Sequence, residues 1–496
     1  MARRAQLTIG LRQAQATRNE PADVHMSANR PLPLVAPKIV PALDPGFCPA
    51  VLANRAFRAG IQHCAVPVEM ALQRADGSVS RLDTVVAAAG PQVQGNFAYL
   101  ERLLKFFLWS RGGCRIHFAG PAELGQQLQK HYKTSPIGRF DASMMGEKIY
   151  EKPFELILMS PGEMPAEREF SAPLGRHLDG CRIGFDLGAS DRKVAALLDG
   201  KTVFSEEVPW DPRAHADPQW HFEQIMDSLK RAAAHLPRVD AIGGSAAGVY
   251  VDNRVKVASL FRGVPEDLFQ QRIKDLFLEI KKAWQGIPLE VVNDGEVTAL
   301  AGAMALQQNG VLGIALGSSL AAGYVNRQGN ITPWLNELAF APVDYQPAAP
   351  VDEWSGDAGC GAQYFSQQCL GRLIPAAGLD VTAALPLPEK LLEVQKRMTA
   401  GDARAGRIYE TIGVWLGYAA AHYAEFYDFQ HLLILGRVTT GAGGGLIVEN
   451  AKAVLRVEFP KLSIQFYLPD EKEKRHGQAM AAASLPAIGS VEALKG

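Results

Sequence analysis

Apolar residues recur along most of this chain at the spacings of strands and helices, and the pattern predicts an α/β protein. Near the amino end, residues 66–72 and 84–89 have the β-rich composition of strands. Residues 97–109 carry leucines and phenylalanines at three- and four-residue steps, which predicts a helix; a strand at 115–118 and a helix at 120–132 follow. This order is typical of an α/β module, and it also occurs in part of a DNA-reading winged helix.

The rest of the chain shows the same strand–turn–strand design twice. Strands predicted around 181–183 and 194–198 flank one turn, and strands at 311–316 and 324–326 flank the small-residue turn 317–323, which is a faint internal repeat. A strand at 239–242 runs into the small-residue loop 243–248, at the strand end where open α/β sheets bind ligands. Further helices are predicted at 221–236, from 265 to about 280, at 297–306, from about 446 and at 477–483, and further strands at 288–292 and 432–435.

Bulk composition narrows the function classes. A chain of 496 residues with 47% hydrophobic content can bury large cores and predicts two or three domains. A formal net charge of -1 gives no global electrostatic argument for nucleic acid or a membrane, and no apolar run approaches a membrane span. The six cysteines are scattered without a C-x-x-C pair, so a disulfide framework is not indicated and a reduced cytoplasm is the expected compartment. Residues 1–45, polar and then proline-rich, predict a flexible tail and linker, with an organellar transit peptide as an alternative.

The first candidate site is the turn at 184–193. A carboxylate at a strand end, Asp186, is followed by a small-residue turn whose backbone N–H groups could approach a metal–polyphosphate closely. Gly188 would allow that approach, Ser190 could donate its hydroxyl, and Lys193 could supply positive charge. The same pattern occurs in ordinary hairpins, so by itself it is a weak signal.

The second candidate is Asn293-Asp294, at the end of a strand and directly before a helix of small residues. Asp294 is placed where it could hydrogen-bond a substrate hydroxyl and accept its proton. The alternative is structural, because Asn and Asp are preferred helix N-caps.

Two later stretches are further candidates for binding phosphate and a nucleotide. The turn containing Gly317, Ser318 and Ser319 repeats the design of the first hairpin. Near the carboxyl end, a strand runs into Gly436 and a glycine loop with Gly443 and Gly444, followed by a helix whose N-terminus could face a nucleotide.

Taken in order, these stretches resemble the ROK family of sugar kinases and sugar-responsive repressors, within the actin-like ATPase fold. Asp186-Leu187-Gly188-Ala189-Ser190 resembles the first phosphate hairpin, and residues 292–300 resemble the segment with the catalytic Asp. Residues 317–323 resemble the second phosphate hairpin, and Ile434-Leu435-Gly436 the adenosine loop. The resemblance covers about 180–490, and four motifs in one order are far more specific than any one of them.

The resemblance implies a two-lobed actin-like (ribonuclease H-like) α/β fold behind a smaller α/β or α+β domain. The implied division is an accessory domain at 46–175, lobe one at 176–300, lobe two at 301–475 and a carboxyl-terminal helix at 476–496 that packs back on lobe one. The implied activity is phosphoryl transfer from ATP to a sugar hydroxyl, with Asp294 as the base and Asp186 orienting Mg²⁺ through water. Asn293, Asp294, Glu337 and Ser259 would contact the sugar; a homodimer is one option for the oligomeric state.

Several positions depart from the family pattern. Asn336-Glu337-Leu338-Ala339-Phe340 keeps the sugar-binding Glu but has Phe340 where a His is usual, and Ala362 replaces a second sugar-binding Glu. Ser259 falls about where the family has an Asn. The His and three Cys of the family's zinc site are absent, so no structural zinc is expected. Asp352, Asp357 and Gln363 could substitute for lost sugar contacts or be solvated loop residues.

Three functions therefore stay open from the sequence. An ATP-dependent kinase acting on a hexose or hexose derivative is the leading one. A non-catalytic sugar-sensing regulator would need a basic recognition helix in 50–175, and no convincing one is found there. An actin-like ATPase acting on another protein would hydrolyse ATP without regard to sugar.

Overall fold

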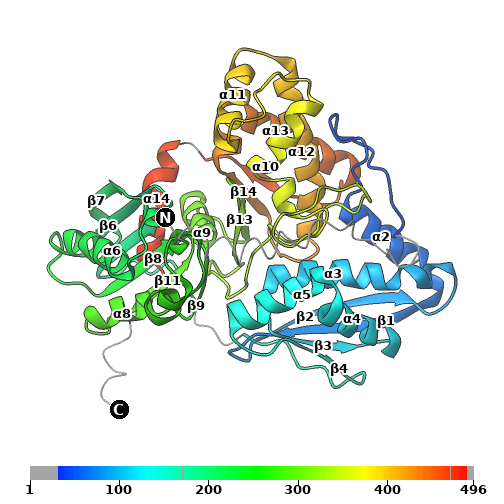
Figure 1. Cartoon of the computed structure of the whole chain (residues 1–496), viewed down its shortest axis with the longest axis horizontal. Helices are drawn as coiled ribbons and strands as arrows, with labels where there is room; N and C mark the ends of the chain where they lie inside the picture. The colour runs from blue at the N-terminus through cyan, green and yellow to red at the C-terminus, as the bar shows by residue number, and fades with distance from the viewer. Residues whose placement is uncertain (1–31, 170–172, 470, 489–496) are drawn as a thin grey trace, which may run out of the picture.

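The computed structural model describes residues 32–169, 173–469 and 471–488. The chain folds into three parts, each with its own main β-sheet (Figure 1). The first part is an amino-terminal domain, and the other two are the lobes that the sequence predicted. None of the described helices is both long and apolar enough to cross a membrane.

Lobe one contains a five-stranded sheet in the order β11-β8-β5-β6-β7. β5, β6 and β7 form an antiparallel meander, whereas β8 and β11 lie parallel to β5. The strands are β5 (Cys181–Leu187), β6 (Asp191–Leu198), β7 (Lys201–Pro209), β8 (Ala241–Ala246) and β11 (Leu289–Asn293). The other elements are α6 (Pro218–Ala233), the ribbon of β9 (Val249–Val251) and β10 (Arg254–Val257), α7 (Glu266–Leu268) and α8 (Leu276–Ala283).

Two glycines explain how a helix from the carboxyl end of the chain packs on this sheet. A Cβ on Gly184 would stand 1.8 Å from the Ala479 carbonyl oxygen, and one on Gly243 would stand 1.7 Å from that of Ala482. Both contacts belong to α14 (Glu471–Ala483), whose backbone therefore lies directly on β5 and β8. The sequence predicted a loop at 243–248, which is wrong for 243–246: these small residues continue strand β8, and their size serves close packing.

Lobe two repeats the design with a four-stranded sheet in the order β13-β12-β14-β15. β12 and β13 form the hairpin, and β14 and β15 lie parallel to β12. The elements are α9 (Asp294–Leu306), β12 (Val311–Leu316), β13 (Leu320–Val325), α10 (Gln367–Ala376), α11 (Leu387–Thr399), α12 (Ala403–Tyr423), β14 (His431–Leu435), α13 (Ala442–Glu458) and β15 (Gln465–Tyr467). A hairpin followed by parallel strands in both lobes confirms the predicted two-lobed actin-like α/β fold.

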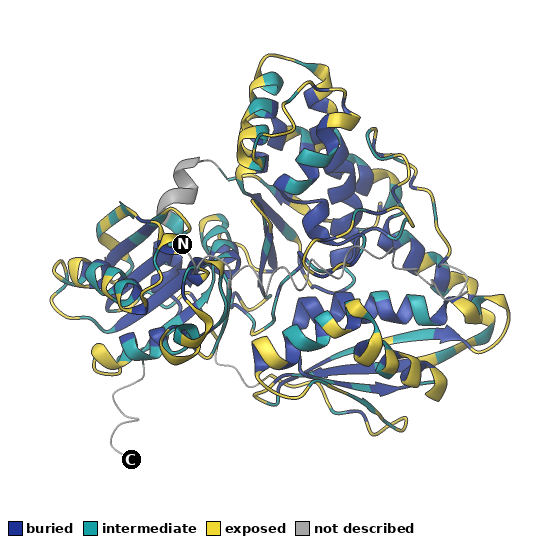
Figure 2. Ribbon diagram, in the orientation of Figure 1, coloured by how far each residue is buried: buried dark blue, intermediate teal, exposed yellow. Residues whose placement is uncertain are grey.

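The amino-terminal domain is an α/β module with the sheet order β2-β1-β3-β4. β1 pairs antiparallel with β2 and β3, and β4 is parallel to β3. Helix α3 is buried along nearly its whole length, between this sheet and the remainder of the molecule (Figure 2). The elements are α2 (Ala50–Gly60), β1 (Ala65–Gln73), β2 (Val79–Ala87), α3 (Asn96–Arg111), β3 (Arg115–Ala119), α4 (Ala122–Thr134), α5 (Pro136–Ser143) and β4 (Glu155–Leu158). Of the two sequence alternatives, the α/β module is the one present.

The proline-rich segment does not behave as a free linker where it is described. The backbone N–H groups of Ile39 and Leu43 donate to the Tyr418 hydroxyl and the Thr411 hydroxyl, both on α12. Leu32 is buried as well. The prediction of a flexible linker is wrong for residues 32–45, because proline fixes an extended chain that can still lie along a helix surface. Residues 1–31 of that predicted tail lie outside the described residues.

Other element boundaries also differ from the prediction. The helix expected from 265 to 280 is interrupted by a π-helical turn, Phe269–Ile273, between α7 and α8. The turn of the second hairpin is confined to 317–319, because β13 already begins at Leu320. α9 and α13 begin earlier than predicted, at Asp294 and Ala442, since small residues in their first turns carry no periodic apolar signal.

Candidate functional site

Asp294 stands at the first position of α9, where β11 ends. Asn293 is the N-cap: its side-chain oxygen accepts a hydrogen bond of 2.7 Å from the backbone N–H of Gly295, and its amide donates to the Gly248 carbonyl. Asp294 also accepts from Gly295, at 3.0 Å. Because Asn293 alone can cap the helix, the structural role that the sequence offered for the pair does not require Asp294.

The surroundings of Asp294 make it a weak acid for a carboxyl group. Burial, with the negative charge of Asp186 as the next cause, raises the pKa of Asp294 to about 6. A pKa just below neutrality leaves the carboxylate largely ionised at pH 7, yet basic enough to accept a proton.

Close backbone packing fixes α9 against the second hairpin. A Cβ on Gly295 would stand 2.6 Å from the Ala322 carbonyl oxygen, and one on Gly323 would stand 2.3 Å from the Gly295 carbonyl oxygen. Only glycine fits at these two positions without movement of one element. The first turn of α9, with Asp294, is therefore held beside β13.

Asp186 lies at the carboxyl end of β5 and is buried. The Ser245 hydroxyl donates to Asp186 Oδ1 at 2.6 Å, and Lys193 Nζ lies 3.5 Å from Oδ2. Burial raises the pKa of Asp186, while the Ser245 hydrogen bond and the Lys193 charge act in the opposite direction. Lys193 also lies 3.0 Å from Asp191 Oδ1, so its charge is shared between two carboxylates.

The two predicted phosphate turns are open to solvent at their tips. Ser190 and Ser318 are exposed, as is Ser319. The Gly188 N–H is used within its hairpin, where it donates to the Asp191 carbonyl at 2.9 Å. The Gly317 N–H likewise donates to the Ser319 carbonyl at 3.0 Å. Only the side chains at the tips, and backbone N–H groups other than those of Gly188 and Gly317, could therefore bind phosphate.

The glycines of the predicted adenosine loop lie in two different environments. Gly436 has a φ of +97° beside Leu316 and lines a cavity described below. Gly443 and Gly444 lie inside the first turn of α13, where a Cβ would stand 2.4 Å from the Tyr409 ring and 2.2 Å from the Thr439 carbonyl oxygen. These two glycines are explained by helix packing, and their Cα atoms do not face open space.

On the acceptor side, a cavity of about 420 Å³ lies between both lobes and the amino-terminal domain. Asn293, Glu296 and Glu337 are among its lining residues. Burial, followed by the charge of Asp294, raises the pKa of Glu337 to about 7, and no side chain of the described residues hydrogen-bonds its carboxyl group. The charge of Asp294 therefore reaches Glu337.

Glu296 is a second acidic group in this cavity, and sequence reasoning missed it. Burial raises the pKa of Glu296 to about 8, and the Asn336 side-chain amide donates to Glu296 Oε1 at 3.2 Å. A charged residue inside a run of small and apolar helical residues is the signal that could have revealed it.

Other residues that were predicted to contact the acceptor do not line this cavity. Ser259 is exposed and does not line it. Asp352, Asp357 and Gln363 are buried but are used elsewhere: Asp352 accepts from Ser355, and Gln363 contacts Gln368. These three are neither substitutes for lost sugar contacts nor solvated.

Asp357 instead takes part in a buried network of ion pairs. Its Oδ2 lies 2.9 Å from Arg102 and 3.1 Å from Lys105, both on α3. Lys105 also lies 3.0 Å from Asp141. Burial alone would raise the pKa of Asp357, but the two cations lower it to about 2.

Aromatic side chains of the amino-terminal domain fill the space beside Phe340. The Phe340 ring centroid lies 4.4 Å from that of Trp109 and 5.5 Å from that of Phe140. Ala362 is buried. The positions where a sugar-binding His and Glu are usual are thus apolar here. Within the described chain no three His, Cys, Asp or Glu residues gather in a way that could hold a metal ion.

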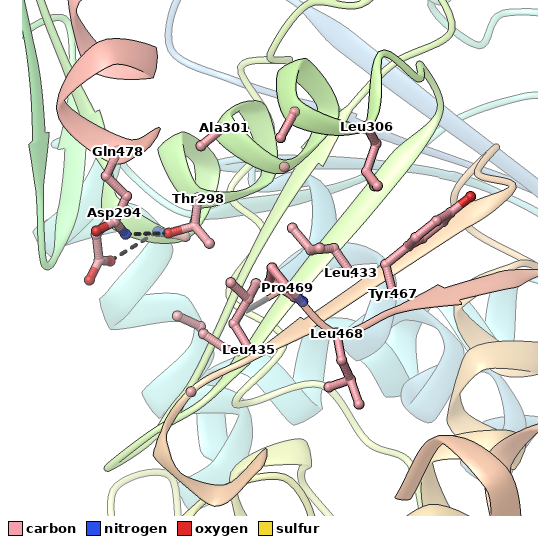
Figure 3. Close-up of a pocket in the computed structure, with 16 residues that line it drawn as sticks. Asp294, Thr298, Ala301, Leu306, Leu433, Leu435, Tyr467, Leu468, Pro469 and Gln478 are labelled. Carbon is pink, nitrogen blue, oxygen red and sulfur yellow. Dashed lines mark hydrogen bonds between the residues drawn. The ribbon is translucent and has the colours of Figure 1, made fainter. Parts of the chain in front are cut away.

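A second cavity, of about 360 Å³, opens along α9 at the junction of the lobes (Figure 3). Asp294 and Thr298 stand at one end of it, where Thr298 accepts a hydrogen bond from the Gln478 amide. Leu433 and Leu435 form much of the opposite wall. Asp294 thus lines this second cavity and not the acceptor cavity. Its neighbour Asn293 lines the acceptor cavity.

The sheet topology of the two lobes agrees with the two-lobed actin-like fold that the sequence predicted. The sequence matches no family model and no curated protein sequence. Among solved structures, a ROK hexokinase from Thermus thermophilus is 18% identical, with 64% of this chain and 100% of that chain covered, at a TM-score of 0.49.

Two other solved structures show the same likeness. A ROK glucokinase from Streptomyces griseus, in complex with glucose and AMPPNP, is 20% identical over 61% of this chain and 98% of its own, at a TM-score of 0.45. A ROK transcriptional regulator, a homolog of the E. coli MLC protein, is 18% identical over 62% of this chain and 78% of its own, at 0.46. Kinases and a transcriptional regulator both occur among these matches.

Proposed function

We propose that this protein is an ATP-dependent kinase that transfers the γ-phosphoryl group to a hydroxyl of a hexose or hexose derivative. The observation that supports it is Asp294: a carboxylate with a pKa of about 6 that helix capping does not require, within electrostatic reach of Glu337, which lines the acceptor cavity. Phosphoryl transfer needs positioning and charge neutralisation more than covalent help, so one well-placed base suffices.

In this proposal, Asp294 accepts the proton of the attacking hydroxyl while Glu337 and Asn293 orient the acceptor. The exposed hairpin tips, with Ser190 and Ser318, contact phosphate oxygens of ATP, and Gly436 lies beside its nucleoside. Closing of the two lobes would exclude water, which otherwise competes as the acceptor.

Asp186 fits a water-mediated Mg²⁺ partner. Mg²⁺ is usually held by one or two carboxylates together with substrate phosphates and several waters, and Asp186 is a single carboxylate whose orientation Ser245 fixes. When bound, Mg²⁺ would neutralise charge on the phosphates of ATP. Ser245 and Lys193 favour the ionised form of Asp186, in opposition to the burial that raises its pKa.

A second candidate function is a sugar-sensing regulator without catalysis. The observation that favours it is the apolar cluster of Phe340, Trp109 and Phe140, which removes polar contacts from the acceptor side. Such a protein would bind a sugar, and it would leave ATP and the sugar unchanged.

The deciding experiment is mass-spectrometric detection of a phosphosugar after incubation with ATP, Mg²⁺ and a panel of hexoses and amino sugars, with Asp294→Asn as the inactive control. We expect one phosphorylated product that is absent with the variant. Sugar binding without any product would favour the regulator, and ATP hydrolysis that no sugar alters would point to an ATPase acting on another protein.

A further inference from the structure

The amino-terminal domain and lobe two share one hydrophobic core. Their buried apolar side chains form a continuous cluster, in which the Phe106 ring centroid on α3 lies 4.0 Å from that of Phe426, shortly after α12. The buried side chains around the lobe-one sheet form a separate cluster. The amino-terminal domain and lobe two therefore pack as one unit, and lobe one meets that unit at its surface.

Within the described chain, the ion pairs that join the amino-terminal domain to lobe one converge on Glu151. This residue follows the π-helical segment Met144–Tyr150. Its Oε2 lies 3.0 Å from Lys256 Nζ, and its Oε1 lies 2.6 Å from Lys274 Nζ. The Lys256 side chain is only 6% exposed, so loss of its carboxylate partner would leave a nearly buried charge unpaired, which is costly.

Both lysines are attached to the ribbon of β9 and β10. Lys256 lies on β10, and the Lys274 carbonyl accepts a hydrogen bond of 3.0 Å from the backbone N–H of Val255, also on β10. A two-stranded ribbon is only marginally stable by itself, so it depends on what packs against it. The Val255 side chain is buried in the core of lobe one, whereas Val249 and Val251 of β9 pack against the core that the amino-terminal domain shares with lobe two.

This ribbon forms one wall of the acceptor cavity. Tyr250, Asp252 and Asn253 are among the residues that line the cavity. Asp252 and Asn253 form the turn, with φ of +52° and +59°, as two-residue hairpin turns require. Asn253 Oδ1 also accepts a hydrogen bond of 2.7 Å from the backbone N–H of Val291, on the strand that leads to Asp294. A displaced ribbon would therefore change the shape of the cavity.

We propose that Glu151 is a positioning residue for the acceptor: it holds the β9–β10 ribbon against the amino-terminal domain and thereby fixes one wall of the acceptor cavity. Glu151 is not among the residues that line the cavity, and it acts through Lys256 and Lys274. This inference rests on the proposed function for the identity of the acceptor, whereas the hold on the ribbon does not depend on phosphoryl transfer.

The first test measures hydrogen–deuterium exchange of the full-length protein without ligand, read out by mass spectrometry. Glu151→Gln removes the charge and keeps the length of the side chain. We expect the amides of 249–257 to exchange about tenfold faster in this variant, because opening of the ribbon no longer breaks two ion pairs. Glu155→Gln is the matched control: Glu155 pairs with Arg115 of its own domain at 2.9 Å, so exchange at 249–257 should not change.

Steady-state kinetics separate a positioning role from a merely structural one. With a sugar that the wild-type protein phosphorylates, we expect Glu151→Gln to raise the KM for that sugar about three- to tenfold, because the bound sugar must now order the ribbon. Both kcat and the KM for ATP should stay within about twofold of wild type. A loss of folded protein would instead lower kcat and leave the KM for the sugar unchanged.

Unchanged exchange at 249–257 in Glu151→Gln would overturn the inference, as would a lower kcat without any change in the KM for the sugar. A wild-type protein that phosphorylates no sugar would refute the kinase. Faster exchange in Glu151→Gln, but not in Glu155→Gln, would in that case still support the hold of the amino-terminal domain on the ribbon.

Discussion

The backbone N–H of Glu337 donates a hydrogen bond of 3.0 Å to the carbonyl oxygen of Trp109, in the last turn of α3. The N–H groups of Asn336 and Leu335 donate in the same way to Ser110, at 3.0 Å, and to Arg111, at 3.3 Å. The final carbonyls of a helix have no partner within it, so this segment satisfies three of them at once. The amino-terminal domain thereby holds the loop that carries the acceptor-side Glu337.

Asp294→Asn should remove most of the phosphoryl transfer. Loss of a general base typically costs 10²- to 10⁴-fold in rate, and we expect kcat to fall by that much while sugar affinity changes little. Steady-state kinetics together with calorimetric binding would measure both. Retention of more than a tenth of the wild-type kcat would contradict the role of Asp294 as the base.

The pH dependence of the reaction should follow Asp294. Because the base must be unprotonated and its pKa is about 6, kcat/KM should rise as the pH increases through about 6 and then level off. The Asp186 charge contributes to that raised pKa, so Asp186→Asn should move the midpoint of the residual activity to lower pH. A profile that is flat from pH 5 to 8 would argue against this assignment.

Gly243→Ala should destabilise the protein by about 2 kcal/mol or more, because the new Cβ would overlap the α14 backbone at Ala482. Gly445→Ala is the matched control: Gly445 is an exposed residue of α13 with nothing near its Cβ position. That change should stabilise by about 0.5–1 kcal/mol, the helix preference of Ala over Gly. Denaturant unfolding without nucleotide compares them, and equal effects would refute the close packing of α14.

Lys105→Met should be strongly destabilising. Lys105 is buried between Asp141 and Asp357, and its removal would leave two buried carboxylates short of a partner, at a cost of about 3–5 kcal/mol. Lys201→Met, at an exposed position of β7, should change the free energy of unfolding by less than about 0.5 kcal/mol. A similarly small effect at Lys105 would mean that the network does not hold α3 to the segment that carries Asp357.

We expect the purified protein to contain no stoichiometric zinc. Burial raises the pKa of the Cys360 thiol, and Asp357 raises it further, whereas zinc binds the thiolate. Elemental analysis before and after chelation provides the measurement, with the melting temperature as the second readout. Zinc present at one equivalent, with a lower melting temperature after its removal, would disprove this expectation.

The sequence by itself predicted the elements whose signals are local. The apolar run 311–316 coincides with β12, and the helix predicted at 97–109 lies within α3, because strand and helix periodicities can be recognised within a few residues. The order of the motifs also predicted the two-lobed fold. Asp186 and Asp294 could be selected as candidates because each is a polar residue at the end of an apolar strand.

Only the tertiary structure decided what depends on contacts between distant segments. The glycines at 243–244 were predicted as a ligand loop, but they extend a strand against α14, nearly 240 residues later in the chain. Glu296, Thr332 and Arg74 come together in one cavity from three separate stretches, and no local pattern relates them. Burial, unpaired hydrogen-bonding atoms and raised pKa values arise from packing, so the chemistry of the acceptor side could be derived only once the fold was known.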